Sequence, residues 1–441
     1  MKNFLDIFRT SDGKNHAVTF ALICTLFFMW GLCNGMLDTL SQYFKSTLHV
    51  SNTEAARVPG ANYTAYFLMA LPAGLLARRF GYKGGILMGL GLIVIGSFCI
   101  LPASHVDVFN WYLVPLFVLA LGLTCLETIA NPYTTVLGSP EKGALRINIA
   151  QTCNGVGWIL GPTLAAYLAY SGSSDGHGTI YKPYLVVSAF GAFLFILFLF
   201  TELPDIKAED ESVTAAKAAG LVAKPLWKRW HFMLAILTQF FYVAAQTGIF
   251  FFFQVYLTSH DMPALTQGLA QHLPASWLTQ DQSDFYITKI GAAGLQSWGA
   301  FVLFLSGRFV GSLLLRSFKA HSTLAVFAAV NTVLMLLIVM GLGWISAVSM
   351  FLSFFFMSIM FPTIFALGIR GLGDHTKLGS SLIVMSIVGG AIMPTLLGWL
   401  SDTFSMRTGF IVPLVCFVFI ALYAAFWPAL EKLDTGREVA D

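Results

Sequence analysis

Long runs of hydrophobic residues, separated by short polar or glycine-rich turns, follow one another along almost the whole chain. The runs 183–200 and 348–365 lack the alternation of hydrophobic and polar residues that a barrel strand needs, whereas a spanning helix needs about 20 mostly apolar residues. The pattern therefore predicts an all-α membrane protein with about twelve membrane-spanning helices. Their expected starts are His16, Ala61, Gly84, Asn110, Arg146, Lys182, His231, Ile290, Thr323, Ser346, Leu378 and Thr408.

The composition agrees with a membrane protein and excludes a water-soluble enzyme. Hydrophobic residues make up 57% of the chain, charged residues only 11%, and the mean hydropathy is +0.74. Soluble domains carry about 25% charged residues. The N-terminal residues have mixed charges, so we do not expect a cleavable signal peptide. All six cysteines fall in predicted spans without CxxC spacing, which indicates packing roles rather than disulfides or a metal site.

The distribution of basic residues predicts the orientation. With both termini on the cytoplasmic side, 19 of the 25 Lys and Arg residues lie in segments on that side, as the positive-inside rule requires. We therefore expect a multi-pass protein with cytoplasmic termini. Arg308 falls within a span, about one turn before Gly311, and we expect its side chain to extend to the cytoplasmic surface, with an ion pair to the intramembrane Glu127 as the alternative.

The chain divides into two halves of one plan. We predict an N-terminal bundle of six helices over 1–202, a cytoplasmic linker over 203–229 and a C-terminal six-helix bundle with a tail over 230–441. Three short segments recur at offsets of 230, 232 and 237 residues, which indicates an internal duplication. They pair Asn131–Gly138 with Phe361–Gly368, Gly161–Leu164 with Met393–Leu396, and Gly74–Arg79 with Gly311–Arg316.

Two six-helix halves are the organisation of transporters that hold a substrate between them near the middle of the membrane. A channel would need a pore loop or rings of like charge, an enzyme a nucleophile or metal cluster, and an ATP-driven pump a glycine-rich phosphate loop. The chain has none of these, so we predict a secondary transporter that is not an enzyme, without cofactor, metal or nucleic-acid partner. The turn and proline residues shared by the halves are expected to have gating or structural roles: Gly74, Arg79, Gly311, Arg316, Pro132 and Pro362.

Two carboxylates within the predicted spans are candidates for proton coupling. A charge at the centre of the membrane costs about 2.5–3.5 kcal/mol and usually faces a cavity or a partner. Glu127 has no Lys or Arg within ten residues, and burial favours the protonated form of such a group. Asp38 lies on one helix face with Trp30 and Asn34, where it either caps the end of the span or lines the cavity.

Polar side chains at helical spacing are the candidate substrate ligands. Amides and hydroxyls on one helix face either join helices or bind a ligand, and aromatic rings offer the flat faces on which sugars stack. Their presence in corresponding spans of both halves favours a neutral, hydroxyl-rich substrate. The candidates are Asn34, Gln151, Asn154, Gln246, Trp30, Asn131 and Tyr242.

At these residues the sequence resembles the fucose–galactose–glucose:proton symporters of the major facilitator superfamily. The resemblance extends over nearly the whole chain and is most specific in five segments: Cys125–Pro132, Ala150–Asn154, Tyr242–Thr247, Phe361–Ile369 and Thr376–Met385. It implies the major facilitator fold, two pseudo-symmetric six-helix bundles, in the cytoplasmic membrane of a bacterium. It also implies that Asp38 and Glu127 carry proton coupling and sugar recognition, and that Asn34, Gln151 and Asn154 face the sugar.

The chain departs from the family pattern at Gly35, Leu37 and Met360-Phe361, where hydrogen-bonding groups are lost, and at Arg78, where an acid is common in the superfamily. The particular sugar therefore does not follow from the resemblance. We predict a monomeric carrier in the lipid bilayer that imports a proton with a neutral monosaccharide of the L-fucose, galactose or glucose class. A facilitative carrier for a related solute such as an amino sugar, a sugar sensor without transport, and a lid formed by 258–284 stay open as alternatives.

Overall fold

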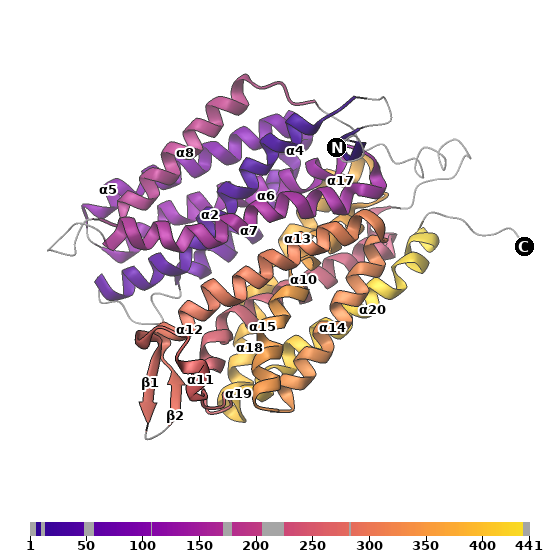
Figure 1. The fold of residues 1–441 in the computed structure, drawn as a ribbon. Helices are drawn as coiled ribbons and strands as arrows, with labels where there is room; N and C mark the ends of the chain where they lie inside the picture. Colours follow the sequence, from indigo (N-terminus) through magenta and orange to yellow (C-terminus); the bar gives the residue numbers. More distant parts are fainter. Residues whose placement is uncertain are drawn as a thin grey trace, which may run out of the picture. The chain divides into compact units, whose positions relative to one another are not determined.

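Most of the described residues lie in α-helices (Figure 1). The structure is a computed structural model, and it describes residues 6–9, 14–47, 57–106, 108–170, 179–204, 225–281 and 284–434. Most of the predicted linker 203–229 lies outside these residues. The structure also leaves undescribed the side chains of Asp38 and of some other helical residues.

Ten stretches of the described residues are long and apolar enough to cross a membrane. One of them, 60–104, has 45 residues, which at about 1.5 Å per residue exceeds two membrane cores of about 30 Å. Gly81 divides it, because its φ of 72° and ψ of −179° are not helical. A further helix, α7, has 28 residues. The prediction of an all-α membrane protein with about twelve spans is confirmed.

The described helices form two compact units. The first comprises Met1–Ile236, Phe365–Val388 and Leu430–Asp441, and the second comprises Leu237–Ile364 and Gly389–Ala429. The division of the chain at 203–229 stays a prediction. The helices from the first half of the chain are α2 (Ala17–Thr47), α4 (Arg57–Phe98), α5 (Ile100–Ser104), α6 (Phe109–Val136), α7 (Gly143–Tyr170) and α8 (Tyr181–Phe200).

The longer helices from the second half of the chain begin with α10 (Trp230–Leu257). They continue with α12 (Lys289–Leu295), α13 (Phe301–Ser317), α14 (Ala320–Val339), α15 (Trp344–Met357), α16 (Met360–Ile369), α17 (Thr376–Met385), α18 (Gly389–Thr403) and α20 (Ile411–Asp434). The short helix α19 (Met406–Gly409) precedes α20. One turn of π-helix, Gln296–Ala300, joins α12 to α13.

Glycines set the close packing of helices in the first unit. A Cβ atom on Gly157 would lie 2.5 Å from the Leu32 nitrogen and 2.5 Å from the Phe28 oxygen, so α7 touches the backbone of α2. Gly161, four residues later, meets the Leu32 oxygen at 2.6 Å in the same way. This spacing is the small-xxx-small pattern by which membrane helices approach each other without a hydrophobic driving force.

Aromatic rings form the core of the second unit. Phe250 stacks on Phe354 with ring centroids 5.0 Å apart, and Phe301 and Phe304 meet its ring edge-to-face. Phe253 packs against the same Phe354 ring at 5.3 Å. Rings in these geometries gain attraction beyond the area that they bury, which joins α10, α13 and α15.

The segment 258–284 contains local secondary structure. It includes the short helix α11 (Gln267–Ala270) and the strand β1 (Leu278–Asp281), which pairs antiparallel with β2 (Asp284–Ile287) (Figure 1). Trp277 lies directly before β1, and a Cβ on Gly291 of α12 would lie 2.3 Å from its oxygen. The hairpin is thus packed on the first turn of α12, and its role as a lid stays untested.

Arg146, at the start of α7, holds the N-terminal segment in the first unit. Its side chain is fully buried, and its guanidinium donates to the carbonyl oxygens of Thr134 (2.9 Å), Ser139 (2.9 Å) and Thr135 at the end of α6. It also donates to the oxygen of Ile7 at 3.0 Å. The arrangement satisfies carbonyl groups that the end of a helix leaves without partners.

Replacing Arg146 with methionine is expected to lower the free energy of unfolding by about 3 kcal/mol or more, because several buried carbonyls lose their donor. The thermal unfolding midpoint in detergent would measure the loss. Arg78→Met, which removes an exposed arginine from α4, is the matched control. Equal midpoints for the two variants would contradict the anchoring role.

Candidate functional site

Glu127 is a buried carboxyl group near the middle of α6. Its side chain is 3% exposed, and every residue of α6 from Gly122 to Thr134 is buried. Neither carboxyl oxygen has a hydrogen bond of normal geometry with a described residue. Within the same described part, the polar group that acts on it is the Tyr66 hydroxyl rather than a basic side chain. Glu127 is therefore a carboxyl group within a membrane-spanning helix that has no basic partner among the described residues.

Three side chains of the first unit meet beside Glu127. The indole Nε1 of Trp30 on α2 donates to the Tyr66 hydroxyl on α4 at 2.7 Å. The Asn34 amide Nδ2 donates to the backbone oxygen of Trp30 at 3.0 Å, which turns this amide toward the same hydroxyl. Tyr66, only 3% exposed, also faces the Glu127 carboxyl, although the geometry falls short of a regular hydrogen bond.

Tyr66 is a site residue that the sequence analysis missed. The signal was present, because Asn62 and Tyr66 are four residues apart and therefore share one helix face in an otherwise apolar span. Trp30 and Asn34 were predicted to share one helix face, and both side chains do point toward the same group, the Tyr66 hydroxyl. Asp38 lies on the same helix, but its side chain is outside the described residues.

The predicted amides of α6 and α7 lie in the same unit. The Gln151 Nε2 donates to the Asn131 Oδ1 at 3.4 Å, and both residues are fully buried. The Asn131 Nδ2 has no hydrogen-bond partner among the described residues. Asn154 donates to the Phe27 oxygen at 3.3 Å, which also joins α7 to α2. Asn131 is thus a buried donor that a ligand or water would satisfy.

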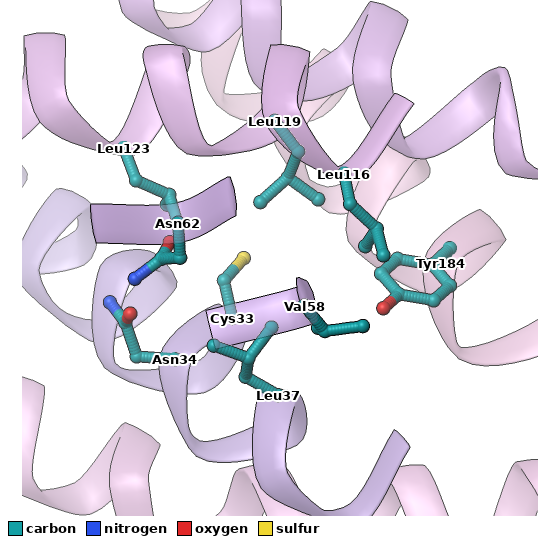
Figure 2. A pocket seen from close by; sticks show the side chains of 9 residues that line it. All are labelled: Cys33, Asn34, Leu37, Val58, Asn62, Leu116, Leu119, Leu123 and Tyr184. Carbon is teal, nitrogen blue, oxygen red and sulfur yellow. The ribbon is translucent and has the colours of Figure 1, made fainter. Parts of the chain in front are cut away.

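A small pocket opens beside Asn34 (Figure 2). Asn34, Asn62 and Cys33 line it together with leucines and valine, and Tyr184 of α8 lies on the far side. Figure 2 shows the amide ends of Asn34 and Asn62 facing each other. The pocket volume is about 10 Å³. That is room for about one water molecule, so a monosaccharide does not fit the pocket in this conformation.

Two of the predicted substrate ligands, Tyr242 and Gln246, belong to the second unit. Tyr242 on α10 is fully buried and donates to the Met357 oxygen at 3.0 Å. Its ring meets Phe361 edge-to-face at 6.2 Å. Gln246, one turn further along α10, is partly exposed. The Tyr242 hydroxyl therefore joins helices in this conformation, while Gln246 is accessible.

The expectation that Arg308 extends to the membrane surface is wrong. Its side chain is 4% exposed and its Nε donates to the Ser358 oxygen at 3.1 Å. The guanidinium lies over the Phe304 ring, 4.6 Å from the centroid. A backbone carbonyl and an aromatic face both stabilise a cation inside the protein, so this side chain does not need to reach water.

Within the first unit, α17 packs against the part of helix α4 that contains Gly74, so this predicted turn residue lies inside a helix. The Lys377 Nζ donates to the Ala77 oxygen at 3.0 Å and lies 4.5 Å from the Tyr82 ring centroid. The Ser380 hydroxyl donates to the Thr128 oxygen at 2.6 Å, one residue beyond Glu127. A segment from the second half of the chain thus contacts α4 and α6 directly.

The other predicted gating or structural residues have different surroundings. Gly74 is in close contact with α17, since a Cβ there would lie 1.8 Å from the Ser381 Oγ. In the second unit, a Cβ on Gly311 would lie 2.3 Å from the Ile359 Cγ2. Arg79 and Arg316 are exposed, whereas Pro132 and Pro362 are buried inside α6 and α16.

The sequence profile described as "Major Facilitator Superfamily" matches residues 19–387. The chain belongs to the Major Facilitator Superfamily. The predictions that the chain resembles this superfamily and is a transporter rather than an enzyme are confirmed, because the relatives that it matches are transporters.

Curated relatives match over almost the full length of this superfamily member. The L-fucose-proton symporter of Escherichia coli (strain K12) is 32% identical, with 94% of each chain covered. The glucose/galactose transporter of Brucella abortus biovar 1 (strain 9-941) is 33% identical over 94% of this chain and 95% of its own.

Solved structures show the same fold. FucP, a Major Facilitator Superfamily transporter crystallised in the outward conformation, has a TM-score of 0.78 at 32% identity and covers 93% of this chain and 99% of its own. The proton:xylose symporter XylE has a TM-score of 0.70 at 11% identity, covering 93% and 96%. The latter likeness concerns the fold alone.

Proposed function

We propose that this superfamily member is a proton-coupled symporter that imports a neutral monosaccharide of the L-fucose, galactose or glucose class. Relatives named as an L-fucose-proton symporter and a glucose/galactose transporter, each more than 30% identical over nearly the whole chain, support this substrate class. The observation that carries the coupling is Glu127, a buried carboxyl without a basic partner among the described residues. Such a group is stable in the membrane when protonated and is costly when charged.

In the proposed cycle Glu127 binds a proton from outside, and Asp38 serves as a second proton site or as an acceptor for a sugar hydroxyl. The sugar then binds to Asn34, Gln151, Asn154, Asn131 and Gln246, with Trp30 and Tyr242 as aromatic surfaces. Loss of the Glu127 proton on the more alkaline cytoplasmic side favours release. The buried Asn131 donor without a described partner supports a polar ligand near α6.

We further propose that both termini are cytoplasmic, in the inner membrane of a bacterium, and that one copy of the chain suffices for transport. The orientation follows from the excess of Lys and Arg in the segments assigned to that side. Arg78, Arg79 and Lys377 belong to these segments, so the contact between α17 and α4 is assigned to the cytoplasmic end. Transport then requires this contact to open.

Uptake into proteoliposomes tests the function. The panel contains hexoses, 6-deoxyhexoses and N-acetylhexosamines, each with and without an inward proton gradient. We expect one sugar to accumulate above its outside concentration only when the gradient is present. If the sugar equilibrated across the membrane at the same rate with and without the proton gradient, the protein would be a facilitative carrier. If it bound sugar without transporting it, the protein would be a sensor. Either result would contradict the proposal.

A further inference from the structure

The Tyr66 hydroxyl occupies a central position between groups of different proposed roles. Its neighbours are Trp30 and Asn34, which are among the proposed sugar ligands, and Glu127, which is the proposed proton site. Tyr66 is buried, so its hydroxyl must be satisfied by these neighbours. A tyrosine hydroxyl can both donate and accept hydrogen bonds, so it can interact with donors and with acceptors at once.

Counting donors and acceptors determines how this hydroxyl is used. A tyrosine hydroxyl has one hydrogen and two acceptor positions, whereas the indole Nε1 only donates. The 2.7 Å contact with Trp30 therefore fills one acceptor position. The Asn34 amide can fill the second, which leaves the single hydrogen for the Glu127 carboxylate.

Protonation of Glu127 changes this count. A protonated carboxyl is itself a donor, and its oxygens have no other hydrogen-bond partner in the described part of the chain. If it donates to Tyr66, it takes the acceptor position that the Asn34 amide would otherwise fill, because Trp30 holds the other. The Asn34 amide is then released to bind a ligand in the space that it shares with Asn62 (Figure 2).

We propose that Tyr66 is a positioning residue that transmits the protonation state of Glu127 to the sugar-binding amide of Asn34. The inference rests on the proposed function and adds a specific route for its coupling. The proton stays on Glu127 throughout, and Tyr66 only exchanges one hydrogen-bond partner for another. Sugar affinity therefore rises when Glu127 is protonated, and the Tyr66 hydroxyl is necessary for that rise.

Other titratable side chains lie near this network. Cys33 of α2 and Tyr184 of α8 line the adjoining pocket. Lys377 of α17 is bound to the Ala77 oxygen, three turns beyond Tyr66 on α4. In the part of the chain with described side chains, Glu127 is the charged group that acts on Tyr66. The side chain of Asp38 is outside that part.

Sugar affinity as a function of pH tests the inference. The probe is the sugar that the wild-type protein accumulates, and its dissociation constant is measured in detergent from about pH 6 to about pH 8. We expect the wild-type affinity to change about tenfold, a coupling in the usual range for linked sites, and the Tyr66→Phe variant to change less than about twofold. A merely structural role would shift the affinity equally at every pH.

Two further variants keep the test decisive. Trp30→Phe removes the indole donor and vacates an acceptor position on Tyr66, so Glu127 no longer competes with Asn34 and the pH dependence also falls. Tyr256→Phe removes another buried hydroxyl, in the second unit, and is expected to keep the wild-type dependence.

The outcomes separate the two claims. If the wild type accumulates sugar with a proton gradient and Tyr66→Phe keeps the full pH dependence, the inference on Tyr66 is wrong while the symport stands. If the wild-type affinity itself does not respond to pH, the proposed coupling fails together with the inference.

Discussion

Replacing Glu127 with glutamine is expected to abolish sugar accumulation driven by a proton gradient while sugar exchange continues. Glutamine keeps the size and hydrogen-bonding ability of the protonated acid but cannot release a proton. One pH unit corresponds to about 1.4 kcal/mol, so coupling to one proton supports about tenfold accumulation. The variant should lose this factor and equilibrate the sugar across the membrane.

Proteoliposome uptake with an inward gradient of about one pH unit measures the loss, and counterflow of labelled sugar without a gradient measures exchange. The matched control is Glu202→Gln, which neutralises an exposed glutamate just after α8. It should accumulate sugar as the wild type does. A Glu127→Gln protein that still concentrates sugar would overturn the coupling role. Loss of exchange as well would assign Glu127 to sugar binding rather than to coupling.

The second large effect is expected from Gly74→Val. A Cβ at Gly74 would lie 1.8 Å from the Ser381 Oγ and 2.9 Å from the Lys377 oxygen. The serine side chain can rotate away, but the Lys377 oxygen belongs to the backbone, so α17 must move. Overpacking of this kind costs about 1–3 kcal/mol, which shifts a two-state equilibrium by roughly 5- to 150-fold.

We expect the contact between α17 and α4 to open in the Gly74→Val variant and the initial rate of uptake to fall by about an order of magnitude. Opening can be followed with a Ser380→Cys substitution, because Ser380 is fully buried under the contact. The introduced thiol should react with a soluble alkylating reagent much faster when combined with Gly74→Val. Mass spectrometry of the labelled peptide separates it from the native cysteines.

Gly60→Val is the matched control, since a Cβ at Gly60 on the same helix meets nothing within 4 Å. It should leave both uptake and thiol reactivity near the wild-type values. Unchanged reactivity in Gly74→Val would mean that α17 accommodates the extra atoms without separating from α4. The contact would then be a static part of the first unit rather than a gate.

Much of the fold was predictable from the sequence because hydropathy is a local property. A helix that crosses a membrane makes its backbone hydrogen bonds within its own segment, so each span can be recognised in the sequence as a long apolar run. Glu127 could be recognised for the same reason, since its rarity within such a run needs no knowledge of the neighbouring helices. The face shared by Trp30 and Asn34 followed from helical spacing alone.

The tertiary structure decided the rest, because those features depend on contacts between distant segments. Tyr66 is one tyrosine among fourteen, and only the approach of α2 and α6 to α4 makes it the neighbour of Trp30 and Glu127. The sequence predicted a surface position for Arg308, because its hydrogen-bond partner, the Ser358 carbonyl, lies fifty residues away in the chain. Lys377 likewise acquires its role from a bond to Ala77, three hundred residues earlier in the chain. The apolar pattern therefore determined where the helices run, and packing determined which polar groups act together.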